Sequence, residues 1–108
     1  MDMHEQEQGG AHKDVYRAKV NLETSRIAWR ELQRFFASGA AIYVSIELDL
    51  VEVAFQVSQD NAAQVAAWME AGVVARVADA QAQEWYDADA DMWAVVISPY
   101  VLVQVAGQ

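Results

Sequence analysis

The C-terminal stretch MWAVVISPYVLVQV, residues 92–105, limits the possible folds of this chain more than any other segment, because it carries no charge. A membrane helix needs about 20 apolar residues, and this run is shorter and is interrupted by Pro99 and Gln104. One strand of this length would far exceed the usual length of about five or six residues. Proline also lacks the backbone N–H that a strand donates to its neighbour. The pattern predicts two strand segments, 93–98 and 100–105, offset at the proline. Both faces of each segment are apolar, which is typical of a buried strand.

The length of 108 residues and the hydrophobic content of 55% predict one folded domain. We expect a disordered tail at residues 1–12 and a single α+β domain at residues 13–108. The acidic, polar start MDMHEQEQGG lacks the apolar core of a signal peptide, and the chain contains no cysteine. These features predict a cytoplasmic protein without a membrane segment.

The charge is divided unevenly along the chain, whose net charge is −9. Six of the seven cations lie within residues 13–34, whereas residues 35–108 hold ten carboxylates and one cation, Arg76. A protein that binds nucleic acid needs a basic face, and this acidic body would repel phosphates. Nucleic-acid binding through helices in residues 13–34 is therefore the less favoured hypothesis. The favoured interpretation is that this segment neutralises the acidic body of its own chain or of a second subunit.

Hydrophobic periodicity and capping residues predict the order α-α-β-α-α-β-α-β, a small three-stranded sheet packed with about five helices. Each expected helix has an apolar stripe along one side. The five helices are expected at residues 14–24, 28–39, 49–58, 61–71 and 79–90. The strands are expected at residues 40–48, 73–77 and 93–105. Residues 49–58 also alternate like a strand, but Asp49 is a good N-cap, as are Asp60 and Asp79 for the helices that follow them.

The aromatic residues on the apolar side of each element are predicted to form the core. These residues are Trp29, Phe36, Trp68, Trp85 and Trp93. The helix–turn–helix–strand order of residues 50–77 allows a winged-helix-like layout. The second helix of that unit carries Glu70 and no cation, so we expect such a layout to serve protein contacts.

Four separated blocks of the sequence resemble a known family: WRELQRFFASG, LDLVEVAFQVSQD, VAAWMEAGVVARV and DMWAVVISPYVLVQ. In this order they are similar to the short bacterial proteins of the domain of unknown function 2288. The resemblance covers about residues 15–104. It departs at Tyr100, where tryptophan is expected after the proline. The resemblance implies a bacterial, cytoplasmic protein and carries no known activity.

The acidic sequence DADAD resembles the first half of a calcium-binding EF-hand loop, with Asp87, Asp89 and Asp91 as candidate metal ligands. The loop also requires a glycine and a bidentate glutamate further on, and Met92 and Ser98 stand at those positions. A solvated helix end is therefore the favoured interpretation. Weak metal binding is the minor hypothesis, because carboxylates at a helix C-terminus would gain from a nearby cation.

The residues needed for most catalytic chemistries are missing or poorly placed. The only histidines, His4 and His12, lie in the expected tail, whereas a general base must be held in position. We therefore predict no catalytic residue and no cofactor. A weak enzyme that uses metal or the carboxylates of Asp49, Glu52 or Asp60 is the alternative, although the two aspartates already have a structural use as N-caps.

The function predicted from these patterns is a non-catalytic protein-interaction domain that binds another protein or a second copy of itself. Residues 100–105 are expected to be covered either by the chain's own helices or by a second copy, because an apolar edge strand invites pairing. The homodimer is the favoured interpretation, and Lys at position 101 or 103 should dissociate it unless those residues are internal core. The candidate binding residues are Trp68, Trp93, Pro99, Tyr100, Val101 and Val103.

Overall fold

The computed structural model describes residues 17–21 and 23–106. Residues 17–21 and 23 are helical and are called here the N-terminal helical segment. The later elements are β1 (Ser25–Ala28), η1 (Trp29–Leu32), α2 (Gln33–Ala37), β2 (Ala41–Val44), α3 (Leu50–Ser58), α4 (Ala62–Glu70), β3 (Val74–Arg76), α5 (Asp79–Asp87), β4 (Asp91–Ile97) and β5 (Tyr100–Val105). The predicted tail of residues 1–12 lies outside the described residues.

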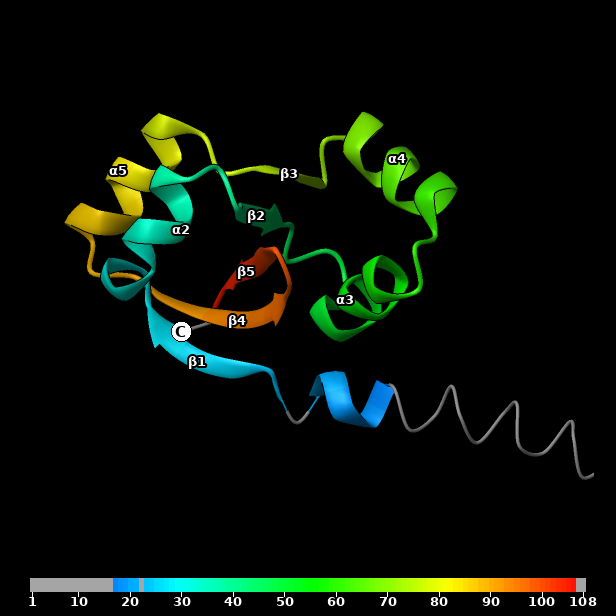
Figure 1. Cartoon of the computed structure of the whole chain (residues 1–108). Helices are drawn as coiled ribbons and strands as arrows, with labels where there is room; N and C mark the ends of the chain where they lie inside the picture. Colours follow the sequence, from blue (N-terminus) through cyan, green and yellow to red (C-terminus); the bar gives the residue numbers. More distant parts are fainter. Residues whose placement is uncertain (1–16, 22, 107–108) are drawn as a thin grey trace, which may run out of the picture.

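The strands form one five-stranded mixed sheet in the order β1-β4-β5-β2-β3. The pairs β1–β4, β4–β5 and β2–β3 are antiparallel, whereas β5 and β2 are parallel. A parallel pair needs a long crossover, and here the crossover comprises α3, α4, β3, α5 and β4 (Figure 1). The uncharged C-terminal run therefore supplies the middle of the sheet, broken into β4 and β5 at Ser98 and Pro99 as the sequence predicts.

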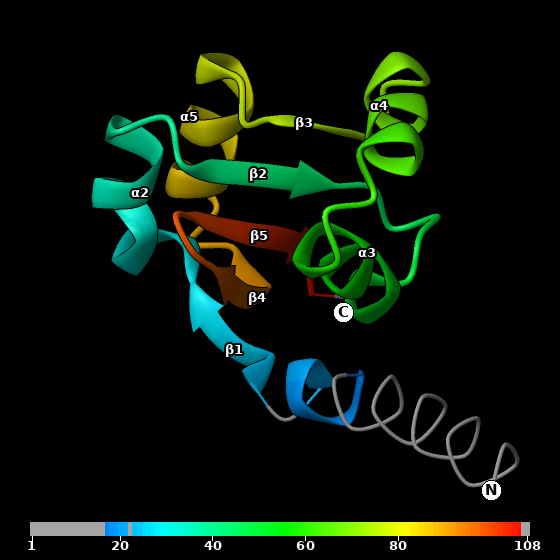
Figure 2. The same cartoon turned by 45° about the vertical axis from the view of Figure 1, so that its right-hand side comes forward.

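The helices lie in two groups on either side of the sheet. Figures 1 and 2 show α2 and α5 together at one side and α3 and α4 at the other. Two separate clusters of buried side chains correspond to these groups. Alternation along β5 divides its side chains between the two cores, because Val101 and Val103 join the first cluster and Leu102 joins the second.

Trp29 anchors the first core. Its side chain is fully buried, and its indole Nε1 donates a hydrogen bond of 3.0 Å to the carbonyl oxygen of Ala82 in α5. Its ring meets Trp85 edge-on at 5.0 Å and Phe36 at 5.8 Å between centroids, a geometry that aromatic pairs favour. The tryptophan thereby ties η1 and α2 to α5 over the same side of the sheet.

The second core lies under α3. The carboxylate of Asp49 accepts a hydrogen bond of 3.0 Å from the amide of Val51 and so caps this helix, as predicted. Leu50, Val53 and Ala54 point into the core, where Val20 of the N-terminal helical segment joins them. The ambiguous stretch 49–58 is therefore a helix, and its period of three to four residues decides which side chains are buried.

The α+β class is confirmed, but the predicted sheet of three strands is wrong in detail. Strand β1 lies where the connection between the first two expected helices and the first residue of the second were predicted. The expected single C-terminal strand is two strands, β4 and β5, which form an antiparallel hairpin. The helix–turn–helix–strand order of residues 50–76 is present. Its strand, β3, is the edge of a five-stranded sheet, so the three-stranded winged-helix layout is not found.

Several local predictions need correction. Trp29 and Trp85 are buried as expected and Phe36 is partly buried, but Trp68 is only partly buried and Trp93 is 39% exposed. The N-cap of α4 is Asn61, whose side chain accepts from the amide of Gln64. Asp60 has a positive φ of 54° between the two helices. Asp79 lies in the first turn of α5, whose N-cap position is taken by Ala78.

Trp29 is buried and Trp93 is partly exposed, so the same substitution at these two positions tests their placement. Trp29→Phe should lower the free energy of unfolding by about 1–3 kcal/mol, because the core loses the buried hydrogen bond from the indole to the carbonyl of Ala82 and part of the ring volume. The same change at Trp93 should cost about 0.5 kcal/mol or less. Urea unfolding followed by circular dichroism measures both. Equal losses would contradict the placement of the two side chains.

Candidate functional site

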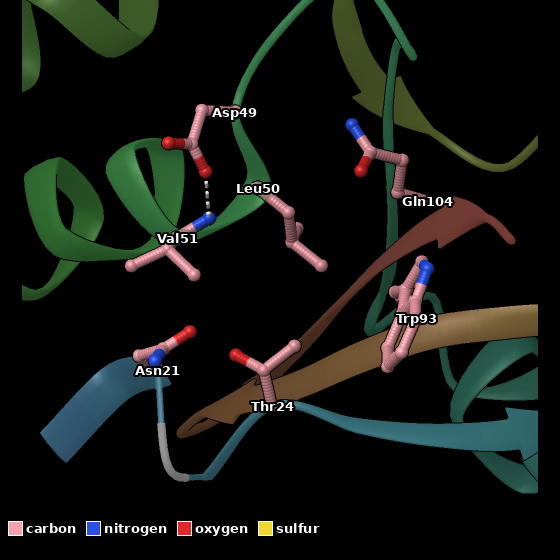
Figure 3. A pocket seen from close by; sticks show the side chains of 7 residues that line it. All are labelled: Asn21, Thr24, Asp49, Leu50, Val51, Trp93 and Gln104. Atoms are coloured by element: carbon pink, nitrogen blue, oxygen red, sulfur yellow. Dashed lines mark hydrogen bonds between the residues drawn. The ribbon is translucent and has the colours of Figure 1, made fainter. Parts of the chain in front are cut away.

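A groove of about 430 Å³ opens between the N-terminal helical segment, the start of α3 and the sheet. Figure 3 shows side chains from all three parts around it. The lining residues are Asn21, Thr24, Asp49, Leu50, Val51, Trp93 and Gln104. We call this hollow the Trp93 groove, because Trp93 is the aromatic residue among those that line it.

Trp93 is exposed because α3 covers only part of its side of the sheet. In β4 it shares a face with Val95, which is 1% exposed and packs in the core under α3. Trp93 lies nearer the start of the strand, opposite Arg26 of β1 in the register. The guanidinium of Arg26 sits over the indole, with its carbon 5.7 Å from the ring centroid. The result is an aromatic wall that is held in place yet open to solvent.

The opposite wall mixes apolar and polar groups. Leu50 and Val51 come from the first turn of α3, and the Asp49 carboxylate that caps this helix lies at the rim (Figure 3). On the side of the N-terminal helical segment, the Thr24 hydroxyl donates a hydrogen bond of 2.7 Å to the carbonyl of Val20. The groove can therefore take an apolar side chain against Trp93 and Leu50, with polar contacts at its edge.

Gln104 fixes the loop that leads into α3. Its side-chain amide nitrogen donates hydrogen bonds of 2.8 Å to the carbonyl oxygens of both Ser45 and Leu48. Ser45 is itself buried, and its hydroxyl accepts from the amide of Glu47 at 3.2 Å. These contacts join the end of β5 to the loop before Asp49. The position of Asp49 and the start of α3, which form one wall of the groove, thus depends on the side chain of Gln104 in β5.

The arginines of the basic N-terminal segment contact the acidic body of the same chain. Within the described residues, Arg17 pairs with Glu52 at 3.2 Å, and Arg26 with Asp91 and Arg30 with Asp89 at 3.7 Å each. All six side chains are more than a third exposed, so each pair contributes about 1 kcal/mol or less. Aromatic rings lie under the same guanidinium groups and under Arg34. In this part of the chain the segment neutralises carboxylates of its own body.

The acidic trio proposed as a weak metal site is divided among other contacts. Asp89 and Asp91 pair with arginines, and the carboxylate of Asp87 accepts a hydrogen bond of 2.8 Å from the side-chain amide of Gln83. In the part of the chain that the structure describes, no three histidine, cysteine or acidic side chains are grouped so that they could hold a metal ion. Two of the three carboxylates thus have an arginine of the same chain beside them.

The six predicted binding residues are not brought together. Trp93 lines the groove, whereas Tyr100, on the same face but at the other end of the hairpin, lines a separate cavity. Trp68 is partly buried against the second core, and Pro99 is exposed at the turn between β4 and β5. Val101 and Val103 are 1% and 0% exposed inside β5, which has a strand on each side.

The homodimer predicted through residues 100–105 therefore loses its basis, because β5 is an internal strand and has no free edge. Lysine at position 101 or 103 would place a charge in the core and destabilise the fold itself. Sequence reasoning also missed Gln104 and Thr24 as site residues. The signal for Gln104 was present, since it is the one polar side chain in β5 besides the tyrosine at its start.

Within the described residues, no helix is long and apolar enough to cross a lipid bilayer. The fold and the groove define a small α+β domain with a mixed five-stranded sheet, helices on both sides and an open tryptophan-lined groove. The chain belongs to the family described as protein of unknown function (DUF2288), whose sequence profile matches residues 15–105.

The chain is also similar to a solved structure, the NMR solution structure of PA1075 from Pseudomonas aeruginosa. The two share 40% sequence identity over 87% of each chain, with a TM-score of 0.77. Among curated proteins, no relative matches the chain. The family resemblance seen in the four sequence blocks is confirmed.

The role of Gln104 can be tested by substitution. Gln104→Leu should lower the free energy of unfolding by about 1–3 kcal/mol, because two side-chain hydrogen bonds to the loop are lost and the carbonyl of Ser45 keeps only the backbone amide of Leu48 as a donor. Gln83→Leu is the control, since it removes one exposed side-chain hydrogen bond and should change stability by about 0.5 kcal/mol or less. Urea unfolding compares the two. If Gln104→Leu lowers the free energy of unfolding no more than Gln83→Leu does, the loop does not depend on this contact.

Proposed function

We propose that this protein is a non-catalytic interaction domain that binds a segment of another protein in the Trp93 groove. The observation that carries the proposal is the exposed indole itself. Tryptophan is among the residues that contribute most to protein–protein binding, especially in a hollow that a partner side chain can fill and dry. Trp93 is 39% exposed beside a groove of about 430 Å³.

Charge favours a basic partner segment. Residues 35–108 hold ten carboxylates and one cation, and Asp49, which no ion pair of the described residues involves, lies at the rim of the groove. Complementary potentials speed the encounter of two proteins and select between partners. The expected ligand is therefore an extended or helical segment with an aromatic or aliphatic anchor flanked by lysine or arginine.

The alternatives have less support. The Asp87–Asp91 group is engaged with arginines and a glutamine, and Asp49 serves as the N-cap of α3. Three arginines of the basic segment already face carboxylates of this chain. A metal-assisted enzyme and a nucleic-acid-binding protein would each have to break these contacts. A partner that binds against Trp93 in the groove does not have to break these ion pairs.

The proposal can be tested with a displayed library of random peptides selected on the intact protein. Selected peptides should carry an apolar anchor next to basic residues, and their binding should weaken as salt rises. Trp93→Ala should reduce their affinity by about 30-fold, the effect of losing a central hot-spot side chain. Affinities are measured by fluorescence anisotropy with labelled peptides.

Tyr86→Ala is the matched control, because Tyr86 is also an exposed aromatic residue with an arginine over its ring. This variant should bind the selected peptides as the wild type does. The proposal is wrong if the library yields no binder, or if the selected peptides bind the Trp93→Ala variant with unchanged affinity. Sedimentation of the free protein shows whether a second copy competes for the groove.

A further inference from the structure

A second cavity, of about 230 Å³, lies between α3, α4 and the sheet. It shares no lining residue with the Trp93 groove. Its walls are mainly apolar and come from five elements: Ile42 of β2, Val57 of α3, Val65 of α4, Val74 of β3 and Leu102 of β5. The cavity is therefore an independent feature of the fold.

The cavity exists because α4 packs loosely on the sheet. No side chain of this helix is buried, and Met69, on its apolar stripe, is 53% exposed. Val65 and Trp68, which the helical period places on the same stripe, are only partly buried. Interiors of proteins are normally packed without such gaps. Space that a larger core side chain would fill is left open here and is lined by Met69 and Val65.

One charged residue, Arg76 of β3, also lines the cavity. Its guanidinium lies beside Gly39, where an added Cβ would be in ordinary contact with Nη1 at 3.7 Å. Arg76 is the one cation of residues 35–108, and no ion pair in the described part of the chain involves it. Tyr100, 40% exposed, lines the same cavity.

We propose that this cavity binds a small apolar monocarboxylate, with its ring or short chain between α3 and α4 and its carboxylate on Arg76. A cavity of about 150 Å³ is known to hold benzene, so the volume here accommodates a ring and a carboxylate. The guanidinium presents a planar fork that matches a carboxylate. This inference is separate from the proposed function, because it concerns a different cavity and a small molecule.

The test uses phenylacetate as the probe and phenylacetamide as its uncharged match. Two-dimensional amide NMR spectra of the intact protein are recorded as each compound is added. Phenylacetate should cause saturable shifts at Val65, Met69 and Val74, with a dissociation constant in the millimolar range or tighter. Phenylacetamide should bind about tenfold more weakly, because it lacks the charge-assisted hydrogen bonds.

Two variants separate the charge from the cavity. Arg76→Gln should weaken phenylacetate about tenfold and leave phenylacetamide unchanged, since only the charged contact is lost. Val65→Phe should fill the cavity and remove the binding of both compounds. Trp93→Ala serves as the control for the other groove and should bind both compounds as the wild type does.

The inference is overturned if phenylacetate gives no saturable shifts, or if the amide and the carboxylate bind equally well. It is also overturned if the shifts gather around Trp93 and Thr24 and survive in the Val65→Phe variant. None of these results bears on peptide binding in the Trp93 groove, so the two proposals can fail separately.

Discussion

The burial of β5 is the constraint on which the rest of the structure depends. Val101, Leu102 and Val103 are almost fully buried, and β5 has β4 on one edge and β2 on the other. A strand that is apolar on both faces requires cover on both, and this explains why the helices divide into two groups. Trp29 and α5 complete one core, and α3 completes the other. The parallel pairing of β5 with β2 in turn requires the long crossover that contains α3 and α4.

Local patterns in the sequence predicted most elements but not their arrangement. The capped, periodic stretch at 50–58 is a helix, and the break at Pro99 separates two strands, because these features depend on neighbouring residues. Strand β1, with the sequence SRIA, shows no alternation, and it pairs with residues near 92 that only the tertiary fold brings close. The strand order likewise depends on contacts between distant segments, so the pattern of residues 100–105 does not show whether this run lies at an edge of the sheet or inside it.

The groove was harder to predict than the fold. Alternation correctly places Trp93 on the face of Val95, but it gives no sign of how far α3 extends over that face. The period of α4 marks its apolar stripe, yet the distance of that helix from the sheet cannot be read from the period. Gln104 interrupts an apolar strand, and its hydrogen bonds to Ser45 and Leu48 become visible only when the loop is placed beside it. Both hollows lie where α3 and α4 leave part of the sheet uncovered.

The most direct test of this account is native-state hydrogen exchange measured at a high and a low protein concentration. The central claim is that β5 is protected within a single chain, by its own neighbouring strands and helices. The amides of Val101, Leu102 and Val103 should be among the slowest to exchange, and dilution should not change their rates. Faster exchange of these amides on dilution would show that a second copy of the chain covers β5, and would contradict the account.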